Sequence, residues 1–476
     1  MVEQRTRNAQ VIGSSPIAGS IKSSERAYLD APIISGSGIR GVFGRSFTTA
    51  DALGFAAAFG ELSGPGPVIV GRDTRSSGPA VEAAVVAGLC SVGCEPVLIG
   101  VAPTPTIQLE VMETGAGGGV AITSSHNPGD WNALKLIGPD GVFLRAPARA
   151  RLMGAMRVPR KWSGHRSVGA PSYSYGAVDR HVEAVAALPL VRCDGRPMRA
   201  VLDVVGGTGL LLGPALMNML GVEYSIINSS MTPDGDFPRV AEPLPGNLEA
   251  LCSAVRESGA DVGFAYDPDG DRLALVDETG RAPGEEYTVA LAIDHVLTHR
   301  PSPVVVNMST SNLAAVCAER HGCTIFRSPV GEVNVVEEME ARGSSIGGEG
   351  NGGVIDRECH PGRDSAVAAA YVVSLLRERD CTLSEWIATL PALRMRKMKF
   401  RLEGTFEALR PSLESEFGIP SDVRDGIRFD TPSGWLHIRP SGTEPVVRLI
   451  VEDSEEAVLD SITERFIRIA GGACVE

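Results

Sequence analysis

The sequence predicts an α/β protein made of several domains. From about Tyr28 onward, short apolar strands alternate with amphipathic helices, which is the pattern of α/β folds. This alternation recurs in three successive units, whereas from about Met395 paired strands and a closing helix follow. At 476 residues the chain is also longer than one hydrophobic core usually supports. We therefore expect three α/β units followed by a smaller α+β unit.

These patterns divide the chain into five segments. Residues 1–27 are polar, contain Gly and Ser, and are expected to form a flexible extension. The three α/β domains are expected at residues 28–188, 189–284 and 285–392, and the α+β domain at residues 393–476.

The first unit begins with a glycine-rich segment. Residues 35–41 contain too many glycines for a helix and predict a loop. Strands are expected at residues 67–70 and 96–99, with a helix at residues 80–89 between them. A third strand at residues 118–122 leads into a polar loop.

The second and third units repeat the alternation of strands and helices. In the second, strands are expected at residues 200–205, 224–227 and 262–266, with helices at residues 210–220 and 248–257. In the third, strands and helices are expected to alternate at residues 304–307, from residue 312, at 323–327, 333–342 and 365–376.

The last unit has a different order. Residues 396–400 alternate as a strand does, and residues 436–438 and 446–451 are expected to pair around a tight loop. A helix is expected at residues 455–470.

The overall composition excludes several classes of partner. A net charge of −14 argues against a general nucleic-acid binder, so an anionic substrate must be attracted by local arginines. No apolar stretch reaches about 18 residues, which argues against a membrane span. The start of the chain lacks the apolar core of a secretory signal. The nine cysteines form no CxxC pair and are expected to be reduced, which suits the cytoplasm.

The loop that follows residues 118–122 reads Thr-Ser-Ser-His-Asn-Pro and contains Ser125 and His126. A capped turn is one interpretation, because Ser and Asn bond their own backbone in turns. His126 is not expected to act as a base toward Ser125, because neighbouring side chains at a turn usually diverge. Ser125 can nevertheless carry chemistry if it holds a phosphoryl group.

The segment Asp-Pro-Asp-Gly-Asp-Arg places three carboxylates at alternate positions, and a hard cation is the usual remedy for their repulsion. An EF-hand loop is excluded because Arg272 stands where a glycine is needed and because both flanks look like strands. A solvated acidic turn remains the alternative. The preferred interpretation is a Mg²⁺ site formed by Asp267, Asp269 and Asp271 that leaves room for a phosphoryl oxygen.

The segment Arg-Pro-Ser-Gly-Thr-Glu-Pro at residues 439–445, with Arg448 beyond it, joins two expected strands. Its hydroxyls, glycine backbone and arginines are suited to a phosphate dianion. It is not a nucleotide P-loop, because the chain has no GxxxxGK[ST] sequence. A simple hairpin turn is the alternative.

Residues 347–353 form a glycine-rich loop that formally matches G-x-G-x-x-G. A strand rather than a helix follows, so a dinucleotide site is excluded. Glu349 and Asn351 are the polar side chains there and are suited to adjacent sugar hydroxyls, with a flexible loop as the alternative. Together the four loops indicate one phosphorylated polyol in a central cleft.

These four loops resemble the signatures of the α-D-phosphohexomutase family, which interconverts the 1- and 6-phosphates of hexoses. All four occur in the order of that family, and the similarity extends from about Ile34 to the C-terminus. The resemblance implies three related α/β domains with mixed sheets and a smaller, mobile α+β domain around a central cleft.

The resemblance also implies roles for individual residues. Ser125 matches the serine that carries the phosphoryl group, and Lys135 falls where the general base of the family lies. Arg40 and Arg272 match arginines around the phosphoserine, and His126 belongs to the same motif and is counted as catalytic. The implied ligands of Mg²⁺ are Ser125, Asp267, Asp269 and Asp271.

The substrate-binding residues follow from the two remaining motifs. Glu349 and Asn351 match the loop that contacts the sugar. The phosphate-binding residues implied by the last motif are Arg439, Ser441, Gly442, Thr443 and Arg448.

Some positions depart from the usual family pattern. Residues 34–40 read Ile-Ser-Gly-Ser-Gly-Ile-Arg where Phe-Gly-Thr-Ser-Gly-Ile-Arg is usual, and Ala133 replaces a common glycine. Gly353 stands where many bacterial members have a histidine. The sequence Glu-Gly-Asn-Gly-Gly is more similar to the archaeal-type branch, whose members are assigned as phosphoglucosamine or phosphomannose/phosphoglucose mutases.

The expected function is therefore that of a phosphoglucosamine mutase, with phosphomannomutase or phosphoglucomutase activity as the alternative. The expected cofactors are one Mg²⁺ per site and a hexose 1,6-bisphosphate, the phosphosugar is the expected partner, and a monomer or homodimer is expected. A Mg²⁺-dependent sugar phosphatase and a non-catalytic sugar-phosphate sensor are more remote alternatives. The sensor is disfavoured because Ser125 and all three aspartates are present.

Overall fold

The computed structural model describes the chain except for residues 1–30, 37, 402–404, 441–445, 472–473 and 476. Its first sheet has seven strands and is mixed: three central strands run parallel, and an antiparallel hairpin joins them at one side. In spatial order the strands are β1 (Ile33–Ser35), β2 (Gly38–Val42), β6 (Trp131–Ile137), β5 (Gly119–Ile122), β3 (Gly66–Arg72), β4 (Cys94–Val101) and β7 (Ser172–Tyr173).

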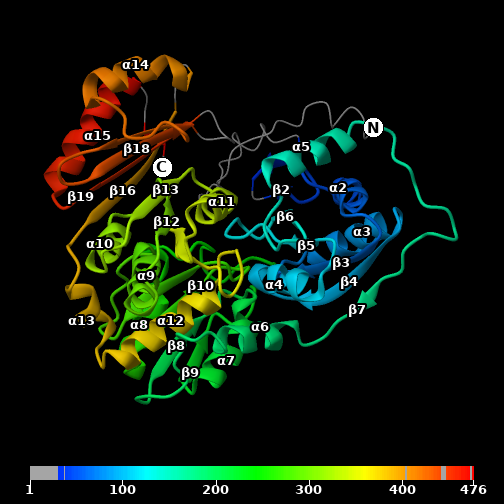
Figure 1. Ribbon diagram of the computed structural model, residues 1–476, viewed down its shortest axis with the longest axis horizontal. Helices are drawn as coiled ribbons and strands as arrows, with labels where there is room; N and C mark the ends of the chain where they lie inside the picture. Colours follow the sequence, from blue (N-terminus) through cyan, green and yellow to red (C-terminus); the bar gives the residue numbers. More distant parts are fainter. Residues whose placement is uncertain (1–30, 37, 402–404, 441–445, 472–473, 476) are drawn as a thin grey trace.

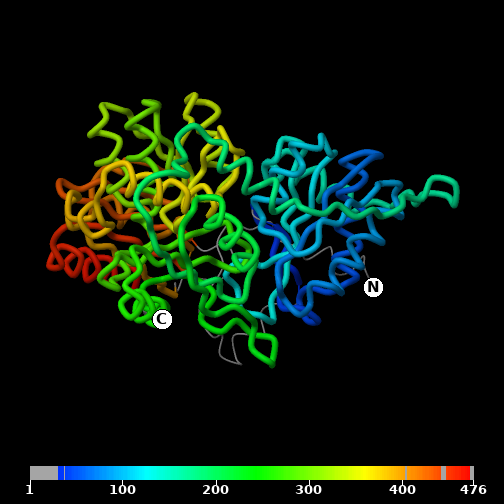
Figure 2. Tube along the Cα trace, turned by 90° about the horizontal axis from the view of Figure 1, so that it is seen from below, coloured from blue at the N-terminus to red at the C-terminus, as the bar shows by residue number. Residues whose placement is uncertain are grey.

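Helices cover both faces of this sheet because its central strands are apolar on both sides. Val68 and Val70 of β3 pack in one apolar cluster with the helices α2 and α3, whereas the intervening Ile69 packs in another with α4. The helices of this domain are α2 (Thr49–Ser63), α3 (Gly78–Cys90), α4 (Thr104–Thr114) and α5 (Ala146–Ala155). The next helix, α6 (Ala177–Ala186), contacts α4 on one side and α7 (Gly209–Leu220) and α12 (Ser365–Glu378) on the other. Figures 1 and 2 both show this unit as a lobe beside the rest of the chain.

The second and third sheets have the same strand order as the centre of the first. In each, the third and fourth strands in sequence form an antiparallel hairpin, and the first strand pairs in parallel with the second and the third. The predicted repeat is therefore present in the topology. The strands are β8 (Arg199–Asp203), β9 (Glu223–Ile227), β10 (Val262–Tyr266) and β11 (Leu273–Asp277), then β12 (Val304–Asn307), β13 (Ile325–Ser328), β14 (Ile346–Glu349) and β15 (Gly353–Asp356).

One continuous core joins the second and third domains, and α12 (Ser365–Glu378) lies at its centre. This helix is buried from Ser365 to Leu376 and contacts helices of both domains. Its sequence is almost wholly apolar because nearly all of its surface is covered. The other helical segments of these domains are α7 (Gly209–Leu220), η2 (Pro245–Asn247), α8 (Glu249–Ser258), α9 (Glu286–His299), α10 (Leu313–Arg320), α11 (Glu332–Arg342) and α13 (Leu383–Ala388).

The C-terminal domain is an antiparallel sheet with two helices on one side, as Figure 1 shows. Phe400, Leu436 and Phe466 belong to its own apolar cluster, separate from those of the other domains. The sheet order is β17 (Ile427–Asp430), β18 (Trp435–Pro440), β19 (Val446–Asp453), β16 (Arg394–Arg401) and β20 (Cys474–Val475), with helices α14 (Phe406–Phe417) and α15 (Glu456–Ala470). The expected α/β architecture with an α+β tail is confirmed.

One expected loop is a β-hairpin instead. Residues 35–41 were predicted to lack regular structure, but β1 and β2 pair antiparallel there and β2 pairs with β6. Gly38 begins β2 with φ of +125°, and β6 approaches it so closely that a side chain would meet the carbonyl oxygen of Leu134. The glycines therefore allow close strand approach rather than an irregular loop.

The helices can also be compared with the thickness of a bilayer. Across the described ranges, none combines the length with the apolar character that a membrane crossing requires.

Candidate active site

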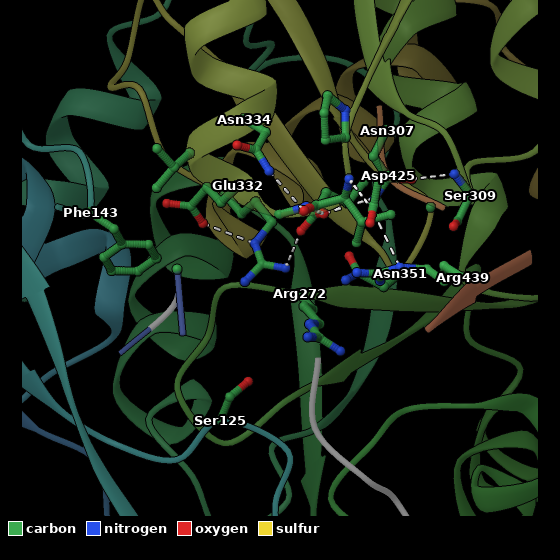
Figure 3. A pocket seen from close by; sticks show the side chains of 18 of the residues that line it. Ser125, Phe143, Arg272, Asn307, Ser309, Glu332, Asn334, Asn351, Asp425 and Arg439 are labelled. Carbon is green, nitrogen blue, oxygen red and sulfur yellow. Dashed lines mark hydrogen bonds and ion pairs between the residues drawn. The ribbon is translucent and has the colours of Figure 1, made fainter. Parts of the chain in front are cut away.

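The four loops singled out in the sequence all belong to hairpins. Three of them lie in the antiparallel hairpin that the three α/β sheets share: β5 to β6, β10 to β11 and β14 to β15. The fourth lies between β18 and β19. Residues of all four hairpins line one cavity of about 500 Å³, among them Ser125, Arg272, Asn351 and Arg439. In Figure 3, Ser125 lies opposite Glu332 and Asn307, with Arg272 between them.

Ser125 lies at the tip of the β5–β6 hairpin and is buried. Its backbone has φ of +49°, a left-handed conformation that non-glycine residues adopt at a cost and that is frequent at active sites. The Ser125 hydroxyl donates to Asp267 Oδ2 at 3.0 Å, across two domains. A group carried on Ser125 therefore faces the aspartate loop.

We expected the side chains of Ser125 and His126 to diverge, but they lie close together. His126 Nδ1 lies 3.3 Å from the Ser125 hydroxyl, because the left-handed backbone at Ser125 turns the two side chains toward each other. Burial, followed by the charges of Arg272 and Arg40, lowers the pKa of His126 well below its usual range. The ring is therefore neutral and within reach of the serine oxygen.

A buried arginine that the sequence analysis did not single out holds the serine loop in place. Arg75 follows β3, and its Nη2 donates to the carbonyl oxygens of Ser125 at 2.6 Å and Asn127 at 2.7 Å. Its Nη1 donates to the carbonyls of Pro128 and Trp131, and its Nε pairs with Asp73 at 3.0 Å. One guanidinium thus fixes four carbonyl groups of the loop. The position of Arg75 just after the carboxyl end of a strand is the one sequence signal that could have marked it as functional.

The three aspartates of the β10–β11 hairpin are fully buried, and their carboxylate oxygens lie within 4.8 Å of one another. Asp269 Oδ2 accepts from Thr104 Oγ1 at 2.6 Å, and Asp267 Oδ1 accepts from the backbone of Asp271 at 3.1 Å. Within the described part of the chain, Asp269 Oδ1 and Asp271 Oδ1 accept no hydrogen bond. Buried carboxylate oxygens in this condition fit a hard dication such as Mg²⁺.

Lys135 of β6 pairs with two of these aspartates. Its Nζ lies 2.5 Å from Asp269 Oδ2 and 3.1 Å from Asp271 Oδ2. Burial lowers the pKa of Lys135, but Asp269 and Asp271 together raise it by more, so the pKa lies above the usual value. Burial and the other two aspartates raise the pKa of Asp267 well above its usual range. The triad is therefore only partly neutralised by the protein.

Arg363 is the second buried arginine that the sequence analysis did not single out. It precedes α12 and bridges three carboxylates: Nη2 lies 2.6 Å from Asp271 Oδ2, Nη1 2.8 Å from Glu349 Oε2, and Nε 3.0 Å from Glu332 Oε2. The aspartate loop and the glycine-rich loop are thereby joined through one side chain. No local pattern marks Arg363, because its partners are distant in the sequence.

The glycine-rich loop presents its two polar residues differently. Glu349 Oε1 accepts from Asn307 Nδ2 and from the backbone of Gly331, both at 2.8 Å, while its Oε2 binds Arg363. Asn351 lines the cavity, and within the described residues its Oδ1 has no hydrogen-bond partner. Asn351 is thus the more available of the two for a ligand hydroxyl.

The cavity wall is rich in cations despite the net negative charge of the chain. Among the described residues, nine Lys or Arg side chains line it, against five Asp or Glu side chains. Arg40 lies in β2, and burial and the charge of Arg272 lower its pKa to about 10. This value is still high enough to keep the guanidinium charged at neutral pH. Arg272 lies 3.4 Å from Glu242 Oε1. These side chains can attract an anionic ligand to the cavity although the chain as a whole is negatively charged, as the sequence predicts.

Arg439 and Arg448 are paired across β18 and β19 at the base of the fourth hairpin, and both line the cavity. Arg439 Nε lies 3.3 Å from Asp425 Oδ2. The predicted phosphate-binding residues Ser441, Gly442 and Thr443 lie outside the described residues.

Sequence profiles of known families match nearly the whole chain. Residues 32–158, 179–280 and 284–393 match the phosphoglucomutase/phosphomannomutase alpha/beta/alpha domains I, II and III. Residues 396–469 match the phosphoglucomutase/phosphomannomutase C-terminal domain.

Individual relatives are similar over almost their full length. A probable phosphoglucosamine mutase of Methanopyrus kandleri is 34% identical over 92% of this chain and 98% of its own. A phosphoglucomutase/phosphomannomutase of Thermococcus kodakarensis is 35% identical over 88% of this chain and 94% of its own. The crystal structure of a phosphoglucomutase/phosphomannomutase family protein from Burkholderia thailandensis superimposes with a TM-score of 0.79 at 25% identity, covering 93% and 97% of the two chains.

The fold, the cavity and these similarities define an enzyme of the isomerase class, a phosphohexomutase. The chain belongs to the phosphoglucomutase/phosphomannomutase family, that is, to the α-D-phosphohexomutases whose signatures the sequence carries.

Proposed function

We propose that the chain interconverts hexose 6-phosphate and hexose 1-phosphate through a phosphorylated Ser125 and a bisphosphorylated sugar, with glucosamine phosphate as the preferred hexose. The observation that carries this proposal is the 3.0 Å contact between the Ser125 hydroxyl and Asp267, which sets the serine against a carboxylate triad. The names of several relatives, among them those from Methanopyrus kandleri and Methanothermobacter thermautotrophicus, support glucosamine phosphate.

The substrate is held at both ends. Its phosphate binds Arg439 and Arg448 at the base of the fourth hairpin, together with Ser441, Gly442 and Thr443 as the sequence motif implies. Asn351 and Glu349 contact the sugar hydroxyls, and Arg363 fixes the orientation of Glu349. The free hydroxyl of the sugar then points toward Ser125 on the opposite side of the cavity.

In the chemical step, the sugar hydroxyl attacks the phosphorus atom carried by Ser125. A new P–O bond to the sugar forms, the bond to Ser125 Oγ breaks, and the proton of the sugar hydroxyl leaves to a nearby group. The neutral ring of His126 is the group placed to accept that proton, and Lys135, whose pKa the aspartates raise, is suited to returning one to Ser125 Oγ. Arg40 and Arg272 balance the negative charge of the transferred group.

Mg²⁺, held by Asp267, Asp269, Asp271 and an oxygen on Ser125, would neutralise charge on the phosphoryl oxygens. The orphaned Asp269 Oδ1 and Asp271 Oδ1 support this ligand set. A catalytic amount of hexose 1,6-bisphosphate would load Ser125 with its first phosphoryl group.

The reverse half of the reaction returns the other phosphate of the bisphosphate to Ser125. The intermediate must therefore turn end for end within the cavity of about 500 Å³, and water must be kept from the phosphoserine meanwhile. The C-terminal domain carries one wall of the cavity and is the element suited to closing it.

A matched pair of serine variants tests the proposal. Ser125→Ala should abolish turnover and the phosphoserine that mass spectrometry detects after incubation with hexose 1,6-bisphosphate. Ser124→Ala is the control, because Ser124 is equally buried and its hydroxyl has no hydrogen-bond partner within the described residues. Full mutase turnover by Ser125→Ala would refute the covalent route.

A substrate panel decides the hexose. The phosphates of glucosamine, glucose, mannose and N-acetylglucosamine are compared by kcat/KM with a trace of bisphosphate, and glucosamine phosphate is expected to give the highest value. The name of the Thermococcus kodakarensis relative makes glucose or mannose phosphate the second candidate. Stoichiometric release of inorganic phosphate would instead indicate a sugar phosphatase, and binding without turnover a sensor.

The cellular setting belongs to the same proposal. The eight cysteines whose side chains the structure describes are unpaired, which supports the expected cytoplasmic location. The enzyme is proposed to act on a small phosphosugar as a monomer or homodimer.

A further inference from the structure

A second group of potential metal ligands lies outside the cavity, on two helices of the third domain. His295 and His299 are one turn apart on α9, and Glu378 is the last residue of α12. One ligand atom of each lies within 4.8 Å of the others. The two helices pack against each other, as Figure 1 also shows.

The distances in this group match those between ligands of one ion. His299 Nε2 lies 2.9 Å and His295 Nδ1 3.9 Å from Glu378 Oε2. Two N or O ligands of a tetrahedral Zn²⁺ lie about 3.4 Å apart, because each is about 2.0–2.2 Å from the metal. The distances of 2.9 Å and 3.9 Å lie on either side of this value, and all three ligand atoms lie within 4.8 Å of one another, so small side-chain adjustments would bring them to one ion.

The hydrogen bond on the far side of His295 points the same way. His295 Nε2 lies 2.9 Å from the carbonyl oxygen of Leu190, which can only accept, so the ring carries its proton on Nε2. In the neutral ring the lone pair of Nδ1 then faces the Glu378 carboxylate. Histidine ligands of metals commonly donate their other N–H to a carbonyl in this manner, which fixes both tautomer and ring orientation.

The surroundings favour a cation and leave it a route of entry. His299 and Glu378 lie at the C-terminal ends of α9 and α12, where the helix dipoles are negative. The charge of nearby Arg379 is compensated by Asp294, 2.9 Å away. Side-chain exposure of 29% for His299 and 26% for Glu378 leaves one side of the group open to solvent.

We propose that His295, His299 and Glu378 form a binding site for a transition-metal dication such as Zn²⁺, separate from the aspartate site. Two imidazoles and one carboxylate are a ligand set suited to Zn²⁺ and unsuited to Mg²⁺, which takes oxygen ligands. The bound ion links the C-terminal ends of α9 and α12. At their other ends, α9 begins with Glu286 of the cavity wall and α12 follows Arg363.

A further cluster of this kind does not carry the same inference. His181 and His360 both donate to Asp364 Oδ2, at 2.7 Å and 3.1 Å, and all three side chains are buried. The carboxylate oxygen is thus already satisfied, and no solvent-open side remains for an ion.

The test is a titration of the full-length protein with Zn²⁺ in the presence of excess Mg²⁺, which occupies the aspartate site. Isothermal titration calorimetry should show one Zn²⁺ per chain, and Co²⁺ in place of Zn²⁺ should give the visible absorption of a tetrahedral nitrogen-ligated ion. His299→Ala and Glu378→Gln should each weaken Zn²⁺ binding by more than about tenfold. Zn²⁺ should also raise Tm in the parent chain but not in these two ligand variants.

His165→Ala is the control, because His165 is exposed and lies two residues after Ser163, whose backbone donates to the carbonyl of Ser91 in the first domain. It should bind Zn²⁺ as the parent does. The proposal is overturned if the parent binds no Zn²⁺ under these conditions, or if both ligand variants bind it with the affinity of the parent. Glu378→Gln keeps the shape of the side chain, so a loss of binding in that variant cannot be attributed to misfolding.

Discussion

Arg363 and Asp271 form a buried ion pair of 2.6 Å that connects the segment before α12 to the aspartate hairpin. The same guanidinium also binds Glu349 and Glu332. The aspartate hairpin of the second domain and the glycine-rich loop of the third therefore cannot move independently. Arg363 is therefore a positioning residue in the proposed reaction.

Replacing this residue should separate charge from geometry. Arg363→Lys keeps a positive charge but cannot span three carboxylates, and we expect kcat/KM to fall by about 10²-fold through misplacement of both loops. Arg363→Met leaves the carboxylates without their partner and should cost about 3–5 kcal/mol of stability. Arg357→Lys, whose arginine bonds only a carbonyl in the described residues, is the control and should behave as the parent. Unchanged kinetics in Arg363→Lys would exclude a positioning role.

Removing the metal should abolish activity reversibly. We expect EDTA-treated protein to be inactive and Mg²⁺ to restore it better than Ca²⁺, because few protein ligands and a phosphoryl oxygen suit the smaller octahedral ion. Asp269→Asn should lower kcat by at least about 10²-fold even with saturating Mg²⁺. The exposed Asp140→Asn should leave kcat unchanged. Full activity after EDTA treatment would contradict the metal requirement.

The burial of His437 should make stability depend on pH. His437 is buried, its Nδ1 is 2.9 Å from Ser309 Oγ and its Nε2 bonds the carbonyl of Asp425. Burial lowers the pKa of His437 to about 4. Between pH 6.5 and 4 the unfolded chain binds the proton and the folded chain does not, so stability falls as the pH falls, by up to about 3 kcal/mol.

Urea unfolding at a series of pH values measures this effect. His437→Gln should show a flatter profile across the same range, since glutamine does not titrate. An equally steep profile in that variant would assign the pH dependence to other groups.

The hairpin that carries Arg40 depends on a glycine. In Gly38→Ala the new Cβ would lie 2.4 Å from the carbonyl oxygen of Leu134, at a residue with φ of +125°. We expect a loss of about 1–3 kcal/mol in stability and a lower kcat, because β2 and Arg40 shift. Gly64→Ala also has a positive φ, of +77°, but open space around it, so it should lose stability only. The prediction is wrong if both variants retain the kcat of the parent.

The chemistry-bearing residues could be predicted from the sequence because each group is local. Asp267, Asp269 and Asp271 occupy five consecutive positions, and Ser125 lies in a hexapeptide that a strand delivers. Strands and helices of the repeated units were predicted for a similar reason, since hydrophobic periodicity is a property of short windows.

Arg75 and Arg363 could not be predicted in this way. Arg75 bonds carbonyls 50 or more positions away, and Arg363 bonds Asp271 over a separation of 92. Such contacts depend on the strand order of the sheets, which the sequence pattern leaves open. The approach of His126 to Ser125 depends on a left-handed backbone at a residue that does not usually adopt one.

The shared strand order of the three α/β sheets has a consequence for how this enzyme can change. Each of these three domains presents its loop from the same hairpin, and the tips of the second and third hairpins are in contact with each other. Arg363 joins Glu349, at the end of β14, to Asp271, and the backbone of Leu273 donates to the carbonyl of Gly352. An exchange of the β14–β15 tip for that of a relative must therefore preserve these contacts with the β10–β11 hairpin. A variant with a new β14–β15 tip must therefore keep Arg363 and its carboxylate partners if the aspartate hairpin is to stay in place.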